Sequence, residues 1–361
     1  MKIVIVTCYH DPNYVRAITL RKAFKKVPGV KLTVLKNRRR GLMRYPEILW
    51  RLWRTKRSVR PDRIVLTFRG QELLLPTLLI AGKTPVWFDE YIVPIAYAKH
   101  EKHSFSLRTK VFHLLAKLGT PLYNQLLRRC EVILADTSAH AELGARSARC
   151  NLSRYLALPV GTDEKLFAPG RLASSTETFD VFFYGTIQPL HGVSVILRAA
   201  TKLKDTPQIR FILIGPSKVF RHAVKKAQKQ GANIVYRRWI PFADIPEQMR
   251  SSGVVLGGPL GGTRQAQHVI TTKTYQALAC GVPVIVGDSQ VTASYFLHKH
   301  NALIVPQGDA EALAKLCLWT SQHQDALAEV GARGRQLFEK EFSTNAIARL
   351  IEARLQRVST K

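Results

Sequence analysis

The sequence has few cysteines and no long apolar run. Its five cysteines are odd in number, scattered and free of any C-x-x-C pair, so neither a disulfide framework nor a zinc ribbon is indicated. The best candidate for a membrane span, residues 73–81, is short and contains Pro76, whereas a spanning helix needs about 20 apolar residues. The apolar run after Met1 is too short for the core of a signal peptide. These absences predict a cytoplasmic protein, free or peripheral on the cytosolic face of a membrane.

Acidic residues are also scarce. The 361 residues include 25 Asp and Glu against 55 Lys and Arg, so the formal net charge is +30. A surplus of this size calls for a polyanionic partner, which is a nucleic acid, an anionic membrane or a phosphorylated substrate. Charge alone does not choose among these three. Hydrophobic residues at 46% and charged residues at 22% are normal for a globular chain and exclude a disordered one.

Short β-branched runs alternate with amphipathic segments of helical length, which is typical of parallel sheets covered by helices. The first series of strand-like runs is 2–8, 31–35, 63–68, 85–88, 131–135 and 155–160, and the second is 180–184, 210–214, 233–236, 254–257, 282–286 and 302–305. The sequence therefore predicts an α/β protein with two doubly wound, Rossmann-like domains that face a cleft.

Turn-forming residues separate the two series. Residues 159–163 are followed by Pro169-Gly170 and the polar run 173–178, which is typical of a linker. We place the first domain at 1–170 and the second at 171–342. A last amphipathic pattern predicts a C-terminal helix within 343–361 that crosses back to the first domain.

The most informative stretch is 271–288. Thr271 or Thr272 is placed to cap a helix whose first turn holds Lys273, and Gly281 ends that helix before a buried strand. A capped helix start beside a lysine binds phosphate well. An ordinary connection of helix, turn and strand shows the same bare pattern.

Within this stretch, the run K-x-x-Q-A-L-A-C-G-V-P-V-I begins at Lys273. It resembles the motif K-x-x-E-A-[LM]-A-x-G-x-P-V-I at the donor site of retaining GT-B glycosyltransferases of group 1, the family 4-like type. Two further segments resemble that family: Phe183-Tyr184-Gly185-Thr186 with His191-Gly192 matches its glycine-rich turn, and 158–163 with Phe167 and Pro169 matches its interdomain motif. The first half resembles the family only in its alternation and in residues 134–137.

The resemblance implies transfer of a sugar from a nucleotide diphosphate sugar, with the donor in the second domain and the acceptor in the first. Charge that develops on the diphosphate would be stabilised by backbone N–H groups, a helix N-terminus and cations. The resemblance places the donor against Gly185, Thr186, His191, His268, Val269, Ile270, Lys273 and Gln276. Because GT-B enzymes generally work without a bound divalent cation, we expect no metal and no other cofactor.

Four of these positions depart from the family pattern. Arg and Lys are usual where Thr186 and His191 stand, and glutamates are usual at His268 and Gln276. The cationic clamp is weaker unless His191 is protonated or other basic residues reach the diphosphate. Gln276 keeps an amide oxygen for ribose hydroxyls but lacks the charge that strengthens such a bond. A degenerate or inactive member of the family is an alternative that fits these changes.

In the first domain, Asp89-Glu90 follows the apolar run 85–88 at the carboxyl end of a predicted strand. Parallel sheets place their ligand sites at that end. Because adjacent residues of an extended chain point to opposite faces, only one of the two can face the cleft. Enzymes of the resembling family often place a polar residue there, so the resemblance implies that Asp89 contacts an acceptor hydroxyl, and Asp89 is the catalytic candidate. A helix cap or a turn acid is the alternative for Asp89.

The segment from Lys36 to Arg63 carries 11 basic and two acidic residues. On a helical projection, one face is apolar, the opposite face holds arginines, and Trp50 leans toward the polar side. Such a helix suits an anionic membrane surface. A sheet-covering helix with a solvated basic face is the alternative. The residues expected to face the membrane are Arg44, Trp50, Arg51, Trp53, Arg54 and Arg57.

We therefore predict a GT-B glycosyltransferase that moves a sugar to a lipid-linked or other anionic glycan acceptor at the cytosolic membrane face, with retention. One alternative is a basic nucleic-acid-binding protein, which the charge supports but no recognised motif does. The other is a nucleotide-sugar epimerase of the same fold. No specific nucleic-acid partner is expected.

Overall fold

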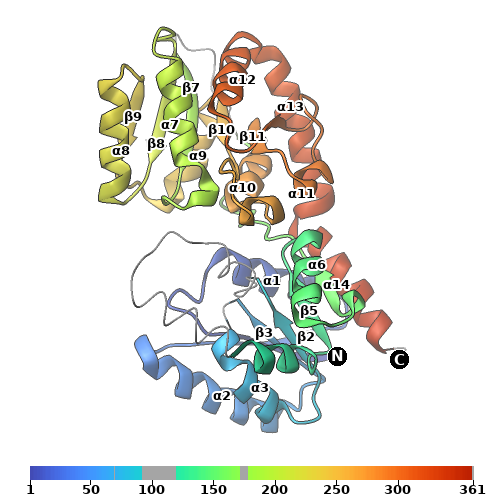
Figure 1. Cartoon of the computed structure of the whole chain (residues 1–361). Helices are drawn as coiled ribbons and strands as arrows, with labels where there is room; N and C mark the ends of the chain where they lie inside the picture. Colours follow the sequence, from blue (N-terminus) through green and yellow to red (C-terminus); the bar gives the residue numbers. More distant parts are fainter. Residues whose placement is uncertain (69, 92–118, 171–177, 360–361) are drawn as a thin grey trace. The chain divides into compact units, whose positions relative to one another are not determined.

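Two compact units divide the chain in the computed structural model (Figure 1). The first unit comprises Met1–Val160 with Thr344–Lys361, and the second comprises Gly161–Ser343. The structure describes residues 1–68, 70–91, 119–170 and 178–359. The first unit thus ends before the predicted boundary at residue 170. All but the last residue of the predicted linker run 173–178 lies outside the described residues.

The first unit is built on a six-stranded parallel sheet in the order β2-β1-β3-β4-β5-β6. The chain places β2 on one side of β1 and β3 on the other, so the strand order reverses between β1 and β3. The strands are β1 (Lys2–Thr7), β2 (Lys31–Lys36), β3 (Arg63–Thr67), β4 (Val86–Asp89), β5 (Val132–Ala135) and β6 (Tyr155–Ala157). The helices include α1 (Val15–Lys26), α2 (Arg44–Val59), α3 (Leu74–Ala81), α6 (Ser138–Ala148) and α14 (Thr344–Ser359).

The last helix of the chain, α14, packs against α1 in this unit. Ile347, Ile351 and Leu355 join the buried cluster that also contains Leu20 and Phe24 of α1. The ammonium of Lys26 donates to the side-chain oxygen of Asn345 at 2.7 Å. The chain therefore returns to its first unit after completing the second.

The second unit holds another six-stranded parallel sheet, in the order β12-β11-β10-β7-β8-β9. This is the doubly wound order, and it reverses between β7 and β10. The strands are β7 (Phe179–Tyr184), β8 (Ile209–Ile214), β9 (Ile234–Arg237), β10 (Val254–Leu256), β11 (Val284–Gly287) and β12 (Leu303–Val305). The helices include α7 (Val193–Lys202), α8 (Lys218–Lys229), α9 (Ile245–Arg250), α10 (Thr272–Cys280), α11 (Gln290–Ala293), α12 (Ala310–Gln322) and α13 (Gln324–Leu337).

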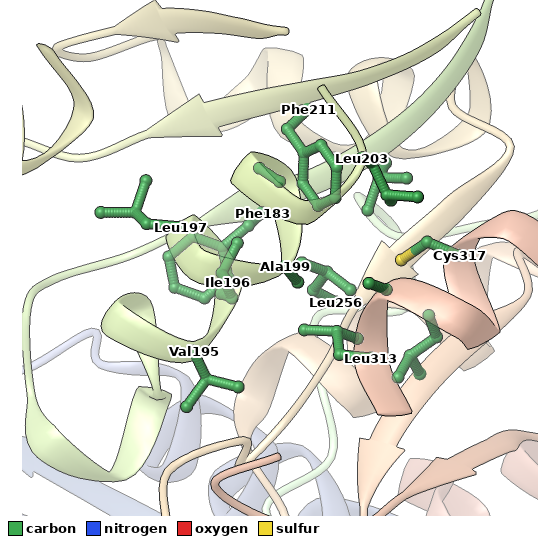
Figure 2. Packing of buried hydrophobic residues seen from close by; sticks show 14 of the residues in the cluster. Phe183, Val195, Ile196, Leu197, Ala199, Leu203, Phe211, Leu256, Leu313 and Cys317 are labelled. Carbon is green, nitrogen blue, oxygen red and sulfur yellow. The ribbon is translucent and has the colours of Figure 1, made fainter. Parts of the chain in front are cut away.

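The core of the second unit lies between the sheet and the helices that cover it (Figure 2). Phe183 and Phe211 of the strands meet Ile196 of α7, and Leu313 of α12 packs on the same cluster. Burying each such side chain stabilises the fold by about 1.5–3 kcal/mol. The strands of the site therefore start from a rigid, close-packed base.

Each predicted strand is present, with its ends shifted by no more than three residues. The predicted α/β fold with two doubly wound sheets is confirmed. The regular alternation of buried β-branched runs with amphipathic helices predicts this fold, because parallel strands are covered by helices on both faces. That the two domains face a cleft stays a prediction.

Candidate functional site

The predicted donor residues of the second unit gather where its strand order reverses. Gly185 follows β7, and a glycine-rich loop, residues 257–262, follows β10. Because β7 and β10 are parallel neighbours, both loops leave the same edge of the sheet. Open α/β sheets bind ligands at such a point.

The two loops lie in close backbone contact. The N–H of Gly261 donates to the carbonyl oxygen of Leu190 at 3.0 Å. A Cβ atom at Gly261 would meet the carbonyl oxygen of Pro189 at 1.9 Å, and one at Gly192 would meet the carbonyl carbon of Leu260 at 2.5 Å. Glycine is therefore required at both positions, since no side chain fits between the loops.

Helix α10 begins at Thr272 beside this loop pair, and its N-cap residue is Thr271. The hydroxyl of Thr271 donates to the carbonyl oxygen of Gly257 and forms no cap hydrogen bond. The predicted side-chain cap is therefore wrong, because the hydroxyl joins α10 to the loop after β10 instead. The position of the helix start was predicted correctly.

Lys273 lies in the first turn of α10 and is 6% exposed. Its Nζ atom lies 3.5 Å from the position of a Cβ atom at Gly185 and 5.2 Å from the ring centroid of Phe183. Burial lowers the pKa of Lys273 to about 8, and no carboxylate of the described residues forms an ion pair with it. A buried ammonium without a counter-ion, at a helix N-terminus, is a strong site for an anion.

His191 lies next to Lys273 but does not add a second positive charge. Its Nδ1 atom lies 2.8 Å from the carbonyl oxygen of Thr186. A carbonyl oxygen only accepts, so Nδ1 carries the hydrogen and Nε2 is left as an acceptor. Burial and the charge of Lys273 lower the pKa of His191 to about 4. The imidazole is therefore neutral at pH 7, and Lys273 supplies the charge at this point.

Gln276 is buried one turn further along α10, and the hydroxyl of Tyr184 donates to its Oε1 atom. The amide oxygen that we expected to accept from ribose hydroxyls thus already accepts from a phenol. Tyr184 is the last residue of β7, so this contact joins β7 to α10. Sequence reasoning missed the role of Tyr184.

The other predicted donor residues lie around this centre. His268 ends a short 3-10 helix, Gln265–His268, which contacts the 3-10 helix Pro189–His191. Its Nδ1 atom donates to the carbonyl oxygen of Arg264 at 2.8 Å. Val269 is half-buried, Ile270 is buried, and Thr186 is exposed in the loop after β7. The structure therefore brings these residues to one edge of the second sheet.

In the first unit, Asp89 is fully buried in an ion pair with Arg16. Nη2 of Arg16 lies 2.9 Å from Oδ1 of Asp89, and the N–H of Phe68 donates to Oδ2 at 3.2 Å. Arg16 also donates to the carbonyl oxygens of Ala135 and Pro159. The expectation that Asp89 reaches an acceptor is corrected, because its carboxylate is inaccessible and already engaged in holding strand ends together.

Glu90 is also buried. The hydroxyls of Tyr155 and Tyr123 donate to its carboxyl oxygens at 2.7 and 2.9 Å. Burial raises the pKa of Glu90 to about 7, against the lowering effect of these hydrogen bonds. Neither member of the Asp89-Glu90 pair is therefore exposed to solvent.

Helix α2 is confirmed as a helix, and part of its apolar face packs into the core of the first unit. Ile48 and Leu52 are buried in the core of the first unit, as in a sheet-covering helix. Trp50 is 55% exposed and Trp53 is 41% exposed. The guanidinium of Arg54 lies 4.8 Å from the Trp50 ring centroid, and that of Arg57 lies 3.8 Å from the Trp53 ring centroid. Trp50 and Trp53, which we expected to face a membrane, are therefore both exposed, and their contact with a membrane stays a prediction.

The two remaining arginines of α2 are held by the protein itself. Arg51 donates to Glu47 at 3.0 Å and to the carbonyl oxygen of Lys36 at 2.6 Å. Arg44 donates to the hydroxyl of Tyr45 at 2.8 Å. The exposed pairs on α2 are thus Trp50 with Arg54 and Trp53 with Arg57.

The described residues contain neither a candidate metal site nor a candidate membrane span. No group of His, Cys, Asp and Glu in that part of the chain is arranged to hold a metal ion. None of the helices described is both long and apolar enough to span a membrane.

Comparison with known proteins adds a family pattern to this geometry. Residues 194–353, which include α10 and the glycine-rich loop, match the model of a family described as glycosyl transferase-like. WcaL of Escherichia coli, whose name assigns it to colanic acid biosynthesis as a glycosyltransferase, is 23% identical over 66% of this chain and 59% of its own length. The D-inositol 3-phosphate glycosyltransferase of Stackebrandtia nassauensis is 24% identical over 60% of this chain and 54% of its own. The chain spans less than two thirds of the length of these curated relatives.

Solved structures share the fold over nearly the whole chain. HepE of Anabaena, solved with UDP and glucose, has a TM-score of 0.68 at 15% identity and covers 99% of this chain and 100% of its own. Sucrose-phosphate synthase of Thermosynechococcus elongatus has a TM-score of 0.73 at 14% identity and covers 100% of this chain and 99% of its own. The predicted resemblance to group 1 glycosyltransferases is therefore confirmed: the sequence of the chain is similar to that of glycosyltransferases, and its fold is the GT-B fold.

Proposed function

We propose that this chain transfers a sugar from a nucleotide diphosphate sugar to a lipid-linked or other anionic glycan acceptor. The observation that carries the proposal is Lys273, a buried ammonium at the start of α10 for which the described residues supply no counter-ion. A cation in that state is costly unless an anion comes to it. The diphosphate of the donor is negatively charged and would supply the missing counter-ion.

The reaction needs charge stabilisation more than side-chain chemistry. The bond between the anomeric carbon of the sugar and the distal phosphate oxygen breaks, and the acceptor hydroxyl forms the new glycosidic bond. Its proton passes to the departing diphosphate. Lys273 and the backbone N–H groups at the start of α10 are placed to stabilise the charge that grows on that diphosphate. Gly185 leaves space for its oxygens beside Nζ.

The donor nucleotide that we propose is UDP. HepE, which shares the fold, was solved with UDP, with UDP and glucose, and with UDP-glucose. We place the donor in the second unit, against the residues around Lys273. Retention of the anomeric configuration follows from the family resemblance alone, as does a reaction without a metal ion.

The acceptor proposal comes from the first unit. Its helix α2 exposes two indole rings, each stacked with an arginine, on a basic segment. Trp and Arg side chains suit the headgroup region of an anionic bilayer. An enzyme attached in this way would meet a lipid-linked acceptor at the cytosolic face. The name of WcaL, which points to polysaccharide synthesis, is in keeping with a glycan acceptor.

The two alternatives from the sequence are not favoured. The comparisons give glycosyltransferases, and none of the relatives reported above is a nucleic-acid-binding protein or an epimerase.

The test begins with a thermal-shift screen of UDP-, GDP- and ADP-sugars on the full chain. We expect a rise in Tm with UDP-sugars, because a ligand that binds only the folded state stabilises it. The hits are then assayed for nucleoside diphosphate release with lipid extracts as acceptor. Absence of binding and of product with every donor would contradict the proposal.

A further inference from the structure

A second basic stretch lies in the second unit, at residues 206–243. It contains no Asp or Glu and eight Lys and Arg residues. Of these eight, Arg210 is paired with Asp180 at 2.7 Å. In the described parts of the chain, none of the other seven forms an ion pair with a carboxylate. They are Lys218, Arg221, Lys225, Lys226, Lys229, Arg237 and Arg238.

The fold brings these seven cations to one surface. Helix α8 buries Phe220, Val224 and Ala227 against the sheet, and its cationic side chains are exposed. It packs beside β9, which is the edge strand of the sheet (Figure 1). The N–H of Gly215, before α8, donates to the carbonyl oxygen of Arg237 at 3.1 Å. The segment after β9 therefore lies next to the first turn of α8.

Large apolar side chains are exposed on the same segments. Val219 in the first turn of α8 is 68% exposed, Trp239 is 70% exposed, and Phe242 is 53% exposed. Trp239 directly follows Arg237 and Arg238. We call the seven cations with these three apolar residues the α8–β9 surface. An exposed indole beside two arginines is typical of a membrane interface, where the apolar ring and the charges both find favourable surroundings.

We propose that the α8–β9 surface attaches the second unit to an anionic lipid bilayer. The cations face lipid phosphates and carboxylates, and Trp239 with Val219 and Phe242 enters the headgroup region. Charge complementarity supports an anionic partner, because 38 consecutive residues lack a carboxylate. A single-stranded nucleic acid needs a row of stacking rings along a groove. Here the ring of Phe242 instead makes an edge contact with buried Phe167, at 5.6 Å between centroids.

This attachment is separate from the one proposed for α2. It rests on residues of the other unit and on no step of sugar transfer. If the glycosyltransferase proposal failed, the proposed membrane attachment through the α8–β9 surface would still stand. If that attachment failed, the proposal that Lys273 binds a nucleotide would still stand.

The experiment compares three full-length proteins in co-sedimentation with phosphatidylcholine vesicles, with and without phosphatidylserine, at low and high salt. The first is the wild type, and the second carries Lys225→Gln, Lys226→Gln and Lys229→Gln. The matched control carries Lys202→Gln, Lys315→Gln and Arg333→Gln, which removes the same charge from exposed side chains paired with carboxylates. Each cation near an anionic surface contributes about fivefold in affinity, the equivalent of about 1 kcal/mol.

We expect the α8 variant to bind phosphatidylserine vesicles at least tenfold more weakly than the control at low salt, and Trp239→Phe to reduce quenching of tryptophan fluorescence by brominated lipid. Equal loss in the α8 variant and the control would overturn the proposal, since net charge alone would explain binding. Unchanged quenching in Trp239→Phe would also overturn it. Loss of duplex DNA binding by the α8 variant with vesicle binding intact would make the partner a nucleic acid instead.

Discussion

The hydroxyl of Tyr184 donates a hydrogen bond to Oε1 of Gln276, and this contact joins β7 to α10 at the proposed donor site. The usual residue at the position of Gln276 in the resembling family is a glutamate. The amide oxygen of Gln276 therefore already accepts a hydrogen bond from within the protein. The ring of Tyr184 in turn lies 5.9 Å from Nζ of Lys273, so the three side chains form one cluster.

Replacement of Gln276 tests this cluster. Gln276→Glu keeps an acceptor for Tyr184, so we expect UDP affinity to stay within about threefold of wild type. Gln276→Leu removes this hydrogen bond of the half-buried tyrosine, which contributes about 0.5–1.5 kcal/mol to folding stability. Urea denaturation measures the stability, and calorimetric titration with UDP measures the affinity. Equal stability of the leucine variant would show that the contact is unimportant.

The pH dependence of UDP binding reports on Lys273. Its pKa is lowered to about 8 in the folded protein, so the ammonium is charged below that pH and neutral above it. We expect UDP affinity to be flat up to about pH 8 and then to fall, by up to about tenfold per pH unit, because binding must restore the proton. Lys273→Arg keeps its charge in this range and serves as the control. A wild-type profile that stays flat to pH 10 would contradict the assignment.

The shifted pKa of Glu90 predicts a pH dependence of a different property, the folding stability of the first unit. Its pKa is raised from 4.5 to about 7, so the folded state holds a proton that the unfolded state releases. The resulting stabilisation is fully present below about pH 4.5 and is lost as the pH rises toward 7. It amounts to about 3 kcal/mol as an order of magnitude.

Glu90→Gln removes this titration. We expect the difference in unfolding free energy between wild type and Glu90→Gln to change steadily between pH 4.5 and 7, in favour of the variant. Denaturant titrations at several pH values measure it. Parallel profiles of the two proteins would mean that Glu90 does not hold the proton.

Membrane attachment through α2 is tested on its exposed pairs. Because Arg44 and Arg51 are engaged within the protein, the sharper variant is Arg54→Gln with Arg57→Gln. We expect it to bind phosphatidylserine vesicles more weakly by about 1 kcal/mol per residue, with the difference shrinking at high salt. Liposome co-sedimentation measures this. Equal binding of variant and wild type would remove α2 from the attachment surface.

Local patterns in the sequence were enough to predict the sheets and the start of α10. Alternation gives parallel strands, and Gly281, at a positive φ of 71°, ends α10 where expected. The run Gly257-Gly258-Pro259-Leu260-Gly261-Gly262 was a further signal for the loop that meets Pro189, and its glycine content could have revealed it.

Contacts between distant residues were not predictable in this way. Arg16 lies 73 residues from Asp89 in the sequence, and no spacing rule connects them. Only the folded sheet places the guanidinium beside the carboxylate, which turns a candidate for acceptor binding into a structural pair.

The most direct measurement of the central claim is the calorimetric titration of Lys273→Ala with UDP, alongside wild type and the exposed control Lys315→Ala. If Lys273 supplies the charge at the donor site, the alanine variant loses about 1.5–3 kcal/mol of binding free energy, the range for a hydrogen bond to a charged group. That loss weakens affinity by roughly 10- to 150-fold, and Lys315→Ala should match wild type. Unchanged affinity in Lys273→Ala would contradict the account.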